Sequence, residues 1–223
     1  METRLSERFL SPLRAGFVYG VVAVVIALVT EFYFLFIDPT NIPAWILAAI
    51  ASFRTQLALA AFLFLAILAA LRAHPTRMDP DASYRSLLVR DCALAATVVA
   101  VMVGVAIFLS TALQATLLAG EIRTFAHDAA PRIVEYVEGV RSGLSNPPPP
   151  TSAEEVEGIL QPPELRDLGR SMGNIAIGAI LLGAVGALVG ALRGSFGSHR
   201  GAGQRTPSAE KPRSPENGKS TDG

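Results

Sequence analysis

Glu31 is the residue whose type and position most suggest chemistry, because it is an acid within the otherwise apolar run 15–37. A carboxylate inside a membrane-spanning segment is a candidate proton or cation site. By helical rise, however, Glu31 lies only about 9 Å before the end of this run, so its side chain can reach the headgroup region. The depth favours an interfacial glutamate. Gln114, in a later apolar run, either hydrogen-bonds Glu31 across a helix interface or, as we prefer, simply holds two helices together.

One other group of titratable residues could form an acid-base or metal site: His127 with Asp128, Glu121 and Glu135. Zinc-type sites pair histidines at helical spacing or combine histidine with cysteine, and this stretch does neither. We therefore expect no metal site and interpret the stretch as a solvated charged linker. The single cysteine, Cys92, excludes an internal disulfide, and we expect it to be a small apolar filler rather than a lipidation site.

No catalytic motif accompanies these residues. The sequence contains no Ser-His-Asp arrangement, no P-loop and no GxGxxG fingerprint. We accordingly expect no catalytic residue, no cofactor and no nucleic-acid partner, and we do not expect an enzyme. Hydrophobic residues make up 51% of the 223 residues and charged residues only 17%, which is typical of an integral membrane protein.

Long apolar runs predict the elements that hold these side chains. The run from Ala93 to Ala119 would be about 40 Å long as a helix, more than the roughly 30 Å of membrane hydrocarbon, so it should tilt or project. The sequence predicts an all-α membrane protein with four transmembrane helices, at about 15–37, 50–71, 93–119 and 171–192. Aromatic residues at the end of the first span are expected to form an interfacial belt: Phe32, Tyr33, Phe34 and Phe36.

The short apolar stretch 44–53 has two interpretations. It is too short to cross a membrane alone, so it is either an interfacial helix or an outer extension of the second span. We leave both open at this point.

Lysine and arginine are divided unevenly between the predicted loops. Thirteen lie in the N-terminus 1–14, in the loop after the second span and from Arg193 onward, against six on the other side. Basic residues favour the cytoplasmic side, so we expect both termini in the cytoplasm and the insert 121–170 outside. The prediction is a multi-pass protein of the inner membrane, with the lipid bilayer as its first partner.

The insert 121–170 is expected to form a small helical domain. Pro131 is predicted to start an amphipathic helix whose apolar positions include Ile133, Val137 and Val140. This face must be covered by a second helix, by the membrane or by another protein, so it is our candidate partner face. Nine acids against five arginines make the insert net negative, which disfavours binding to an anionic membrane surface.

A second short helix is predicted later in the insert. The run 147–150 is four consecutive prolines and should form a stiff spacer. A capping box at 151–155 then predicts a helix that ends at Leu160, before two further prolines.

Glycine spacing predicts how the fourth span packs. Small residues four positions apart line one helix face and let a neighbouring backbone approach closely. The fourth span has such a face at Gly186, Gly190 and Gly194, and the third span has a matching one at Ala96, Ala100 and Gly104. The first span adds Gly16 and Gly20. We therefore expect these helices to pack against one another within one subunit. The tail 194–223 is polar, lacks apolar periodicity and is expected to be disordered.

The layout resembles that of uncharacterised bacterial four-span membrane proteins classed as domains of unknown function. The resemblance covers Ala15 to Arg193 and rests chiefly on Gly178–Arg193, with its pattern Leu-Leu-Gly-Ala-Val-Gly-Ala-Leu-Val-Gly-Ala-Leu-Arg. It implies a bacterial inner membrane and no specific activity.

Two functions from different classes follow. The leading one is a non-catalytic structural or protein-interaction subunit that binds a membrane protein partner or a second copy of itself. The alternative is a small transporter or channel subunit that uses Glu31 and Gln114 as an intramembrane polar site. A set of four spans with one acid favours the first.

Overall fold

The computed structural model describes residues 11–74, 83–147 and 149–201, with side chains up to Phe196. This described part is helical and contains no β-strand, and four of its helices are long and apolar enough to cross a membrane. The predicted all-α, multi-pass membrane fold is therefore confirmed. In chain order the elements are α2 (Pro12–Glu31), the 3-10 turn η1 (Tyr33–Leu35), α3 (Ala44–Arg72), α4 (Tyr84–Thr116), α5 (Ala119–Arg141), α6 (Ala153–Leu160) and α7 (Asp167–Gly201).

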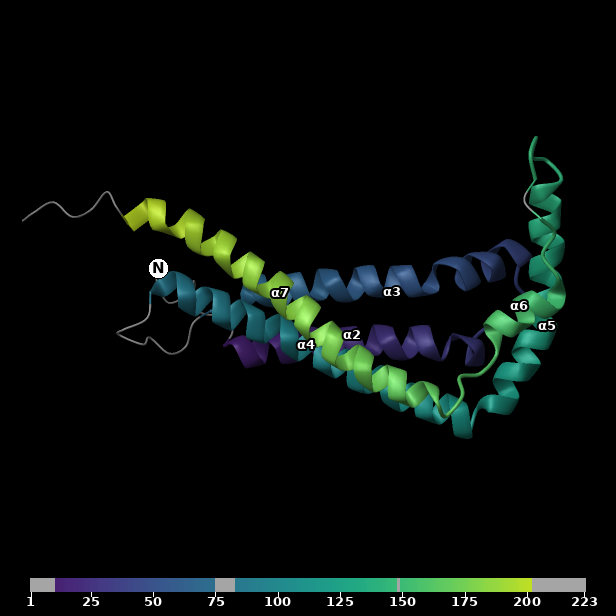
Figure 1. Ribbon diagram of the computed structural model, residues 1–223, viewed down its shortest axis with the longest axis horizontal. Helices are drawn as coiled ribbons and strands as arrows, with labels where there is room; N and C mark the ends of the chain where they lie inside the picture. Colours follow the sequence, from purple (N-terminus) through teal and green to yellow (C-terminus); the bar gives the residue numbers. More distant parts are fainter. Residues whose placement is uncertain (1–10, 75–82, 148, 202–223) are drawn as a thin grey trace, which may run out of the picture.

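The four long helices are organised around α4, which contacts α2, α3 and α7. α4 and α7 lie side by side and cross the pair formed by α2 and α3 at a slant (Figure 1). The shared interior, which we call the bundle core, is built largely from small side chains with no exposed surface, such as Ala15, Ala66, Ala69, Ala95 and Ala96. Small side chains let these helices approach closely, which favours dispersion contacts in a lipid environment.

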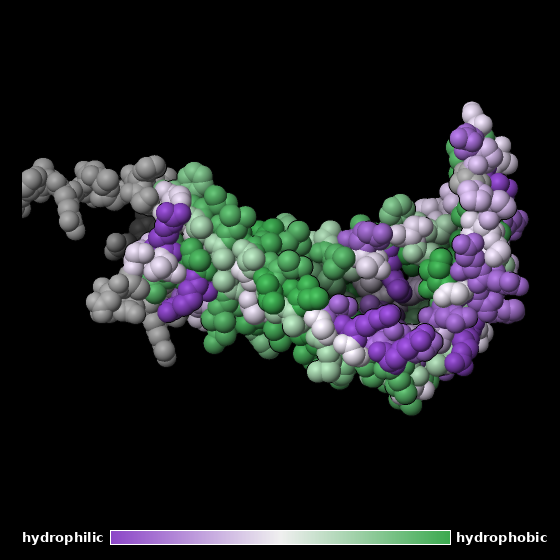
Figure 2. All heavy atoms as spheres, in the orientation of Figure 1, coloured by the Kyte–Doolittle hydropathy of each residue, from purple (hydrophilic) through white to green (hydrophobic). Residues whose placement is uncertain are grey.

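A second hydrophobic cluster forms at one end of the bundle, where α5 stands across the helix ends and α6 packs on it (Figure 1). This cap core contains Phe34 of η1, Leu47 of α3, Ile122 and Phe125 of α5, and Val156 of α6. We call η1, the first turns of α3, α5 and α6 together the cap. Figure 2 shows a hydrophobic band along the long helices, with hydrophilic residues gathered at the cap and at the opposite end.

The stretch 44–53 is the first part of α3, which runs unbroken for 29 residues. Of the two interpretations left open by the sequence, the extension of the second span is therefore correct. Its residues Leu47 and Ala48 are buried in the cap core, so this extension serves the cap rather than the bundle core.

The helix limits differ from the predicted span limits in the first and third spans. α2 begins at Pro12, behind an N-cap hydroxyl of Ser11, and ends at Glu31 instead of continuing to residue 37. The aromatics after it lie in and beside η1, and Phe34 is buried in the cap core. α4 begins at Tyr84, capped by Ser83, because the helix includes polar residues that precede the apolar run, and it ends at Thr116 rather than at Ala119.

α5 contradicts the prediction that Pro131 starts a helix. Pro131 lies inside α5, a helix of 23 residues. A proline there removes one backbone hydrogen bond, but apolar side chains on both sides of it, including Phe125 and Ile133, are buried in the cap core. Their burial offsets that loss. His127 and Asp128 consequently lie on a helix, so their interpretation as a linker was wrong.

The ends of the other elements are closer to expectation. The Ser152 hydroxyl accepts a hydrogen bond from the Glu155 amide and α6 ends at Leu160, as the capping box predicts. α7 starts at Asp167 and continues to Gly201, so the first residues of the predicted disordered tail are helical. The remainder of that tail, 202–223, and the N-terminal 1–10 lie outside the described residues.

Candidate functional site

A polar layer separates the bundle core from the cap core in each of the three helices that connect them. Along α2 the order is Ala27 in the bundle core, then Glu31, then Phe34 of η1 in the cap core. Along α3 it is Ala48 in the cap core, then Arg54, then Ala58 in the bundle core. In α4 the buried polar residues Ser110, Thr111 and Gln114 occupy the corresponding place. We call these five residues, Glu31, Arg54, Ser110, Thr111 and Gln114, the polar layer.

Glu31 and Gln114 meet, as one of the two interpretations of Gln114 anticipates. The Gln114 side-chain amide donates to the Glu31 carbonyl at 2.9 Å and to the Glu31 carboxylate at 3.3 Å. Because the carbonyl lies at the last residue of α2, it has no amide of the next helical turn to bond with. The amide therefore both caps α2 and fixes it to α4.

Arg54 is the member of the polar layer that sequence reasoning missed. Its guanidinium carbon lies 4.5 Å from the centre of the Tyr33 ring, within the range of a cation–π interaction. Arg54 and Glu31 both line a small cavity of about 70 Å³ beside Thr55. The signal that could have found Arg54 is its place in an apolar helix, where a charged residue calls for a partner.

Tyr33 connects the polar layer to the cap. Its ring makes an edge-to-face contact with Phe125 of α5, with 5.4 Å between ring centres. Burial raises the pKa of Tyr33 above its ordinary value of 10.0, the nearby Arg54 charge lowers it, and Glu31 raises it again. At neutral pH the phenol is therefore protonated and its hydroxyl can donate a hydrogen bond.

The layer is closed on the side of the bundle core. Thr111 donates to the carbonyl of Ile107 within its own helix, and the buried Ser110 hydroxyl finds no hydrogen-bond partner among the described residues. Phe62 and Val103, buried at 6% and 5% exposure, pack immediately beyond it.

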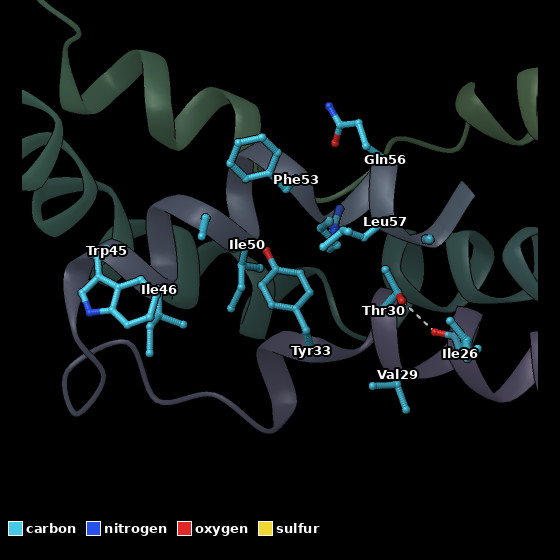
Figure 3. A pocket seen from close by; sticks show the side chains of 13 residues that line it. Ile26, Val29, Thr30, Tyr33, Trp45, Ile46, Ile50, Phe53, Gln56 and Leu57 are labelled. Carbon is cyan, nitrogen blue, oxygen red and sulfur yellow. Dashed lines mark hydrogen bonds between the residues drawn. The ribbon is translucent and has the colours of Figure 1, made fainter. Parts of the chain in front are cut away.

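On one side the polar layer opens into a groove of about 700 Å³ between α2 with η1 and α3 (Figure 3). Trp45 and Ile46 lie at one end of the groove, and Ile26 and Val29 lie at the other. The Tyr33 ring projects between these ends from the η1 side.

A second polar junction lies at the opposite end of the bundle. Arg193 of α7 donates to the carbonyls of Ala70 and Ala73 at 2.9 and 2.8 Å, and thereby caps the end of α3. The Cys92 thiol donates to the same Ala70 carbonyl at 3.1 Å and is fully buried. This burial agrees with a packing role for Cys92.

The glycines of α7 lie where α4 comes closest. A side chain at Gly186 would meet the Cys92 carbonyl and the Ala96 side chain, one at Gly190 would meet the Leu88 carbonyl, and one at Gly194 would meet Arg85. Farther along, Gly104 faces Ile175. Ala100, which lies between Ala96 and Gly104 in the sequence of α4, is also buried. The two glycines of α2 face α4 as well: Gly16 lies against Val98, and Gly20 lies against Met102. Close contact therefore occurs within one chain.

The candidate partner face of the insert is covered in part by the chain itself. Ile133 is 5% exposed in the cap core and Val137 packs against it, whereas Val140 is 52% exposed. Ile133 cannot present itself to a partner, so that part of the prediction was wrong. The reason is that α6 and the first turns of α3 cover the face, which the sequence could not establish.

The titratable residues of α5 do not converge. The His127 side chain is exposed, and its nearest acid is Glu157 of α6 at 4.0 Å. Within the described part of the chain no three histidine, cysteine or acidic residues are placed to share a metal ion.

The side of α7 that faces away from α4 is exposed and carries one amide. Large apolar side chains, among them Ile177, Leu181 and Leu188, are 56% to 60% exposed there. Asn174 is exposed on the same side. Its helical neighbour Ile175 packs against Gly104, which lies six residues before Ser110 and so about 9 Å along α4 from the nearest member of the polar layer in that helix.

Comparison with known proteins gives no relative: no family model matches the chain, and neither the curated proteins nor the solved structures contain a match. The resemblance to uncharacterised bacterial four-span proteins stays a prediction.

Proposed function

We propose that this chain is a non-catalytic interaction subunit of a bacterial inner membrane that pairs with a second copy of itself through the exposed side of α7. In this proposal the cap lies on the extracytoplasmic side and both termini are cytoplasmic, in agreement with the distribution of basic residues.

The observation that carries the proposal is the position of Asn174. It is exposed, its helical neighbour Ile175 faces Gly104, which lies six residues and about 9 Å along α4 from Ser110 of the polar layer, and its side chain has no hydrogen-bond partner among the described residues. An amide surrounded by lipid leaves two donors and one acceptor group unbonded. A neighbouring helix that supplies the complementary groups would satisfy them.

A second copy suits this amide because one side chain carries both donors and an acceptor. Two asparagines related by a two-fold axis can therefore bond each other, and two-fold pairs are the commonest oligomers. α7 also has the room for such a contact. In the most apolar 18-residue stretch of α7, only 11% of the residues are buried inside the chain, against 39% in the corresponding stretch of α4.

The experiment is a titration of association in liposomes. Two samples of the chain, labelled with donor and acceptor fluorophores on the tail, are reconstituted together over a range of protein-to-lipid ratios. We expect energy transfer that rises with the ratio, and Asn174→Leu should weaken the apparent affinity roughly threefold to thirtyfold, the value of one or two interhelical hydrogen bonds. Asn174→Gln, which keeps an amide, is the matched control and should retain most of the affinity.

Two results would overturn self-association through this face. One is a wild-type chain that stays monomeric at every ratio, and the other is an Asn174→Leu variant that associates as tightly as the wild type.

The alternative, a small transporter or channel subunit, has one observation in its favour: Glu31 and Arg54 line a cavity within the polar layer. The apolar packing beyond that layer favours the interaction role within a single chain. A liposome flux assay separates the two functions. Ion or proton flux that Glu31→Gln abolishes would favour the transporter, and absence of flux would favour the interaction subunit.

A further inference from the structure

The groove between α2 and α3 combines an apolar wall with one cation. Ile26 and Val29 of α2 and Ile50 and Leu57 of α3 line it, and its volume is about 700 Å³ (Figure 3). Pockets of this size hold small organic molecules or a segment of hydrocarbon chain. Arg54 is the single charged side chain among the residues that line this groove, all of which belong to the described part of the chain.

The Arg54 guanidinium lacks acceptors for its donors. Its contact in the structure is with the face of the Tyr33 ring, and it forms no hydrogen bond or ion pair with a described residue. A guanidinium carries five N–H donors and stays charged, so at the edge of a membrane it requires an anionic acceptor. Glu31 lines the neighbouring cavity of about 70 Å³ but not the groove, and its carboxylate already accepts from Gln114.

The position of Arg54 restricts what that acceptor can be. It lies level with Glu31, the last residue of α2, where the bundle core gives way to the cap. Apolar side chains of the groove extend from this level toward the bundle, and Trp45, an amphipathic side chain typical of membrane interfaces, lies at the cap end. The groove therefore fits a molecule that joins an anion to a hydrocarbon chain.

We propose that the groove is a binding site for an anionic phospholipid, with its phosphate on Arg54 and one acyl chain along Ile26, Val29 and Leu57. Arginine binds phosphate through two parallel hydrogen bonds, which gives it an advantage over a simple point charge. The protonated Tyr33 hydroxyl projects into the same groove and supplies a further donor. Free phosphate would leave the apolar wall uncovered, so the lipid is the better occupant.

Trp45 is the only tryptophan of the 223 residues, and it lies at the cap end of the groove, about 14 Å along α3 from Arg54 and away from the proposed acyl chain. The reporter variant therefore combines Trp45→Phe with Leu57→Trp, which places a single tryptophan beside that chain. Bromine atoms on a lipid chain quench tryptophan fluorescence at short range. The intact chain is reconstituted in phosphatidylcholine bilayers that contain a fixed fraction of brominated lipid, either phosphatidylglycerol or phosphatidylcholine. We expect brominated phosphatidylglycerol to quench the tryptophan at position 57 with an apparent preference of about fivefold, the effect of one arginine on an anionic lipid.

Variants separate the phosphate contact from the chain contact. Arg54→Gln should abolish the preference for phosphatidylglycerol, whereas Arg123→Gln, which removes an exposed arginine of α5, should leave it unchanged. Val29→Phe keeps Arg54 and fills part of the groove, so it should reduce quenching by both lipids. Circular dichroism and thermal unfolding identify any variant that fails to fold, and Val29→Phe then tests the groove independently of Arg54.

Three outcomes would overturn the proposal. The first is equal quenching of the reporter variant by the two brominated lipids. The second is a preference that survives in folded Arg54→Gln. The third is loss of the preference when inorganic phosphate at millimolar concentration is added to the vesicles, since the site would then bind the free ion rather than the lipid.

Discussion

The Gln114 amide ties the end of α4 to the end of α2 through its bonds to Glu31. Gln114 is 7% exposed, so removal of the amide leaves the Glu31 carbonyl without its donor in a place that water reaches poorly. Gln114→Leu should lower the free energy of unfolding by about 1 kcal/mol, the usual size of one interhelical hydrogen bond. Reversible unfolding in mixed micelles, followed by circular dichroism, measures the loss.

Gln56→Leu is the matched control for this prediction, because Gln56 is an exposed glutamine of α3 in the same membrane region. The same substitution there should leave the unfolding free energy unchanged or raise it slightly. Equal losses in the two variants would show that the bond to Glu31 is not what stabilises the structure at Gln114.

Only some members of the polar layer could be predicted from the sequence. Glu31 and Gln114 stand out because each is a polar residue in an apolar run, and their pairing could be named as an alternative. Arg54 could not be added to them, because the sequence left open whether 44–53 is an interfacial helix or an extension of the second span, and so did not place Arg54 relative to the first span. Only the continuity of α3 places it beside Tyr33.

At the scale of elements, α7 and α4 approach each other closely at Gly190, where the nearest atoms belong to the α4 backbone. A β-carbon at Gly190 would lie 2.6 Å from the Leu88 carbonyl oxygen and 2.7 Å from the Val89 α-carbon, so the two helices would have to separate. Gly190→Ala should destabilise the bundle by about 1–3 kcal/mol, the cost of overpacking a well-packed interior. The Tm in detergent reports the change.

Gly178→Ala provides the comparison on the same helix, because nothing lies within 4 Å of a β-carbon built there. Alanine also has the higher helix propensity, so this variant should be neutral or slightly stabilising. A Tm that falls equally in both variants would contradict close packing at Gly190.

The existence and packing of the helices followed from local rules, whereas several of their ends did not. Glycine spacing in α7 indicated the face that meets α4, because small side chains have one main use in a membrane helix. The prediction that a helix starts at Pro131 was wrong, because the burial of α5 in the cap core outweighs the one backbone hydrogen bond that the proline removes. The prediction that Ile133 is exposed to a partner was wrong for a related reason. Its exposure depends on where α3 and α6 pack, and local sequence patterns do not give that tertiary arrangement.

The whole molecule is a bundle with a cap at one end, and its two hydrophobic cores meet at the polar layer. If the outer faces of the long helices contact lipid and the cap contacts water, the polar layer marks a membrane boundary. The groove and the exposed side of α7 then present two separate surfaces to the membrane, one for a phospholipid and one for a second chain.

The orientation of the cap is the most direct test of this account. A cysteine is introduced at Ser142, just after α5, or at Ser83, just before α4, and intact cells are treated with a membrane-impermeant thiol reagent; the native Cys92 is buried and should stay unlabelled. Cysteine at 142 should be labelled in intact cells, and cysteine at 83 only after the cells are opened. Labelling of position 83 in intact cells, or protection of position 142, would contradict the four-span arrangement with its cap outside.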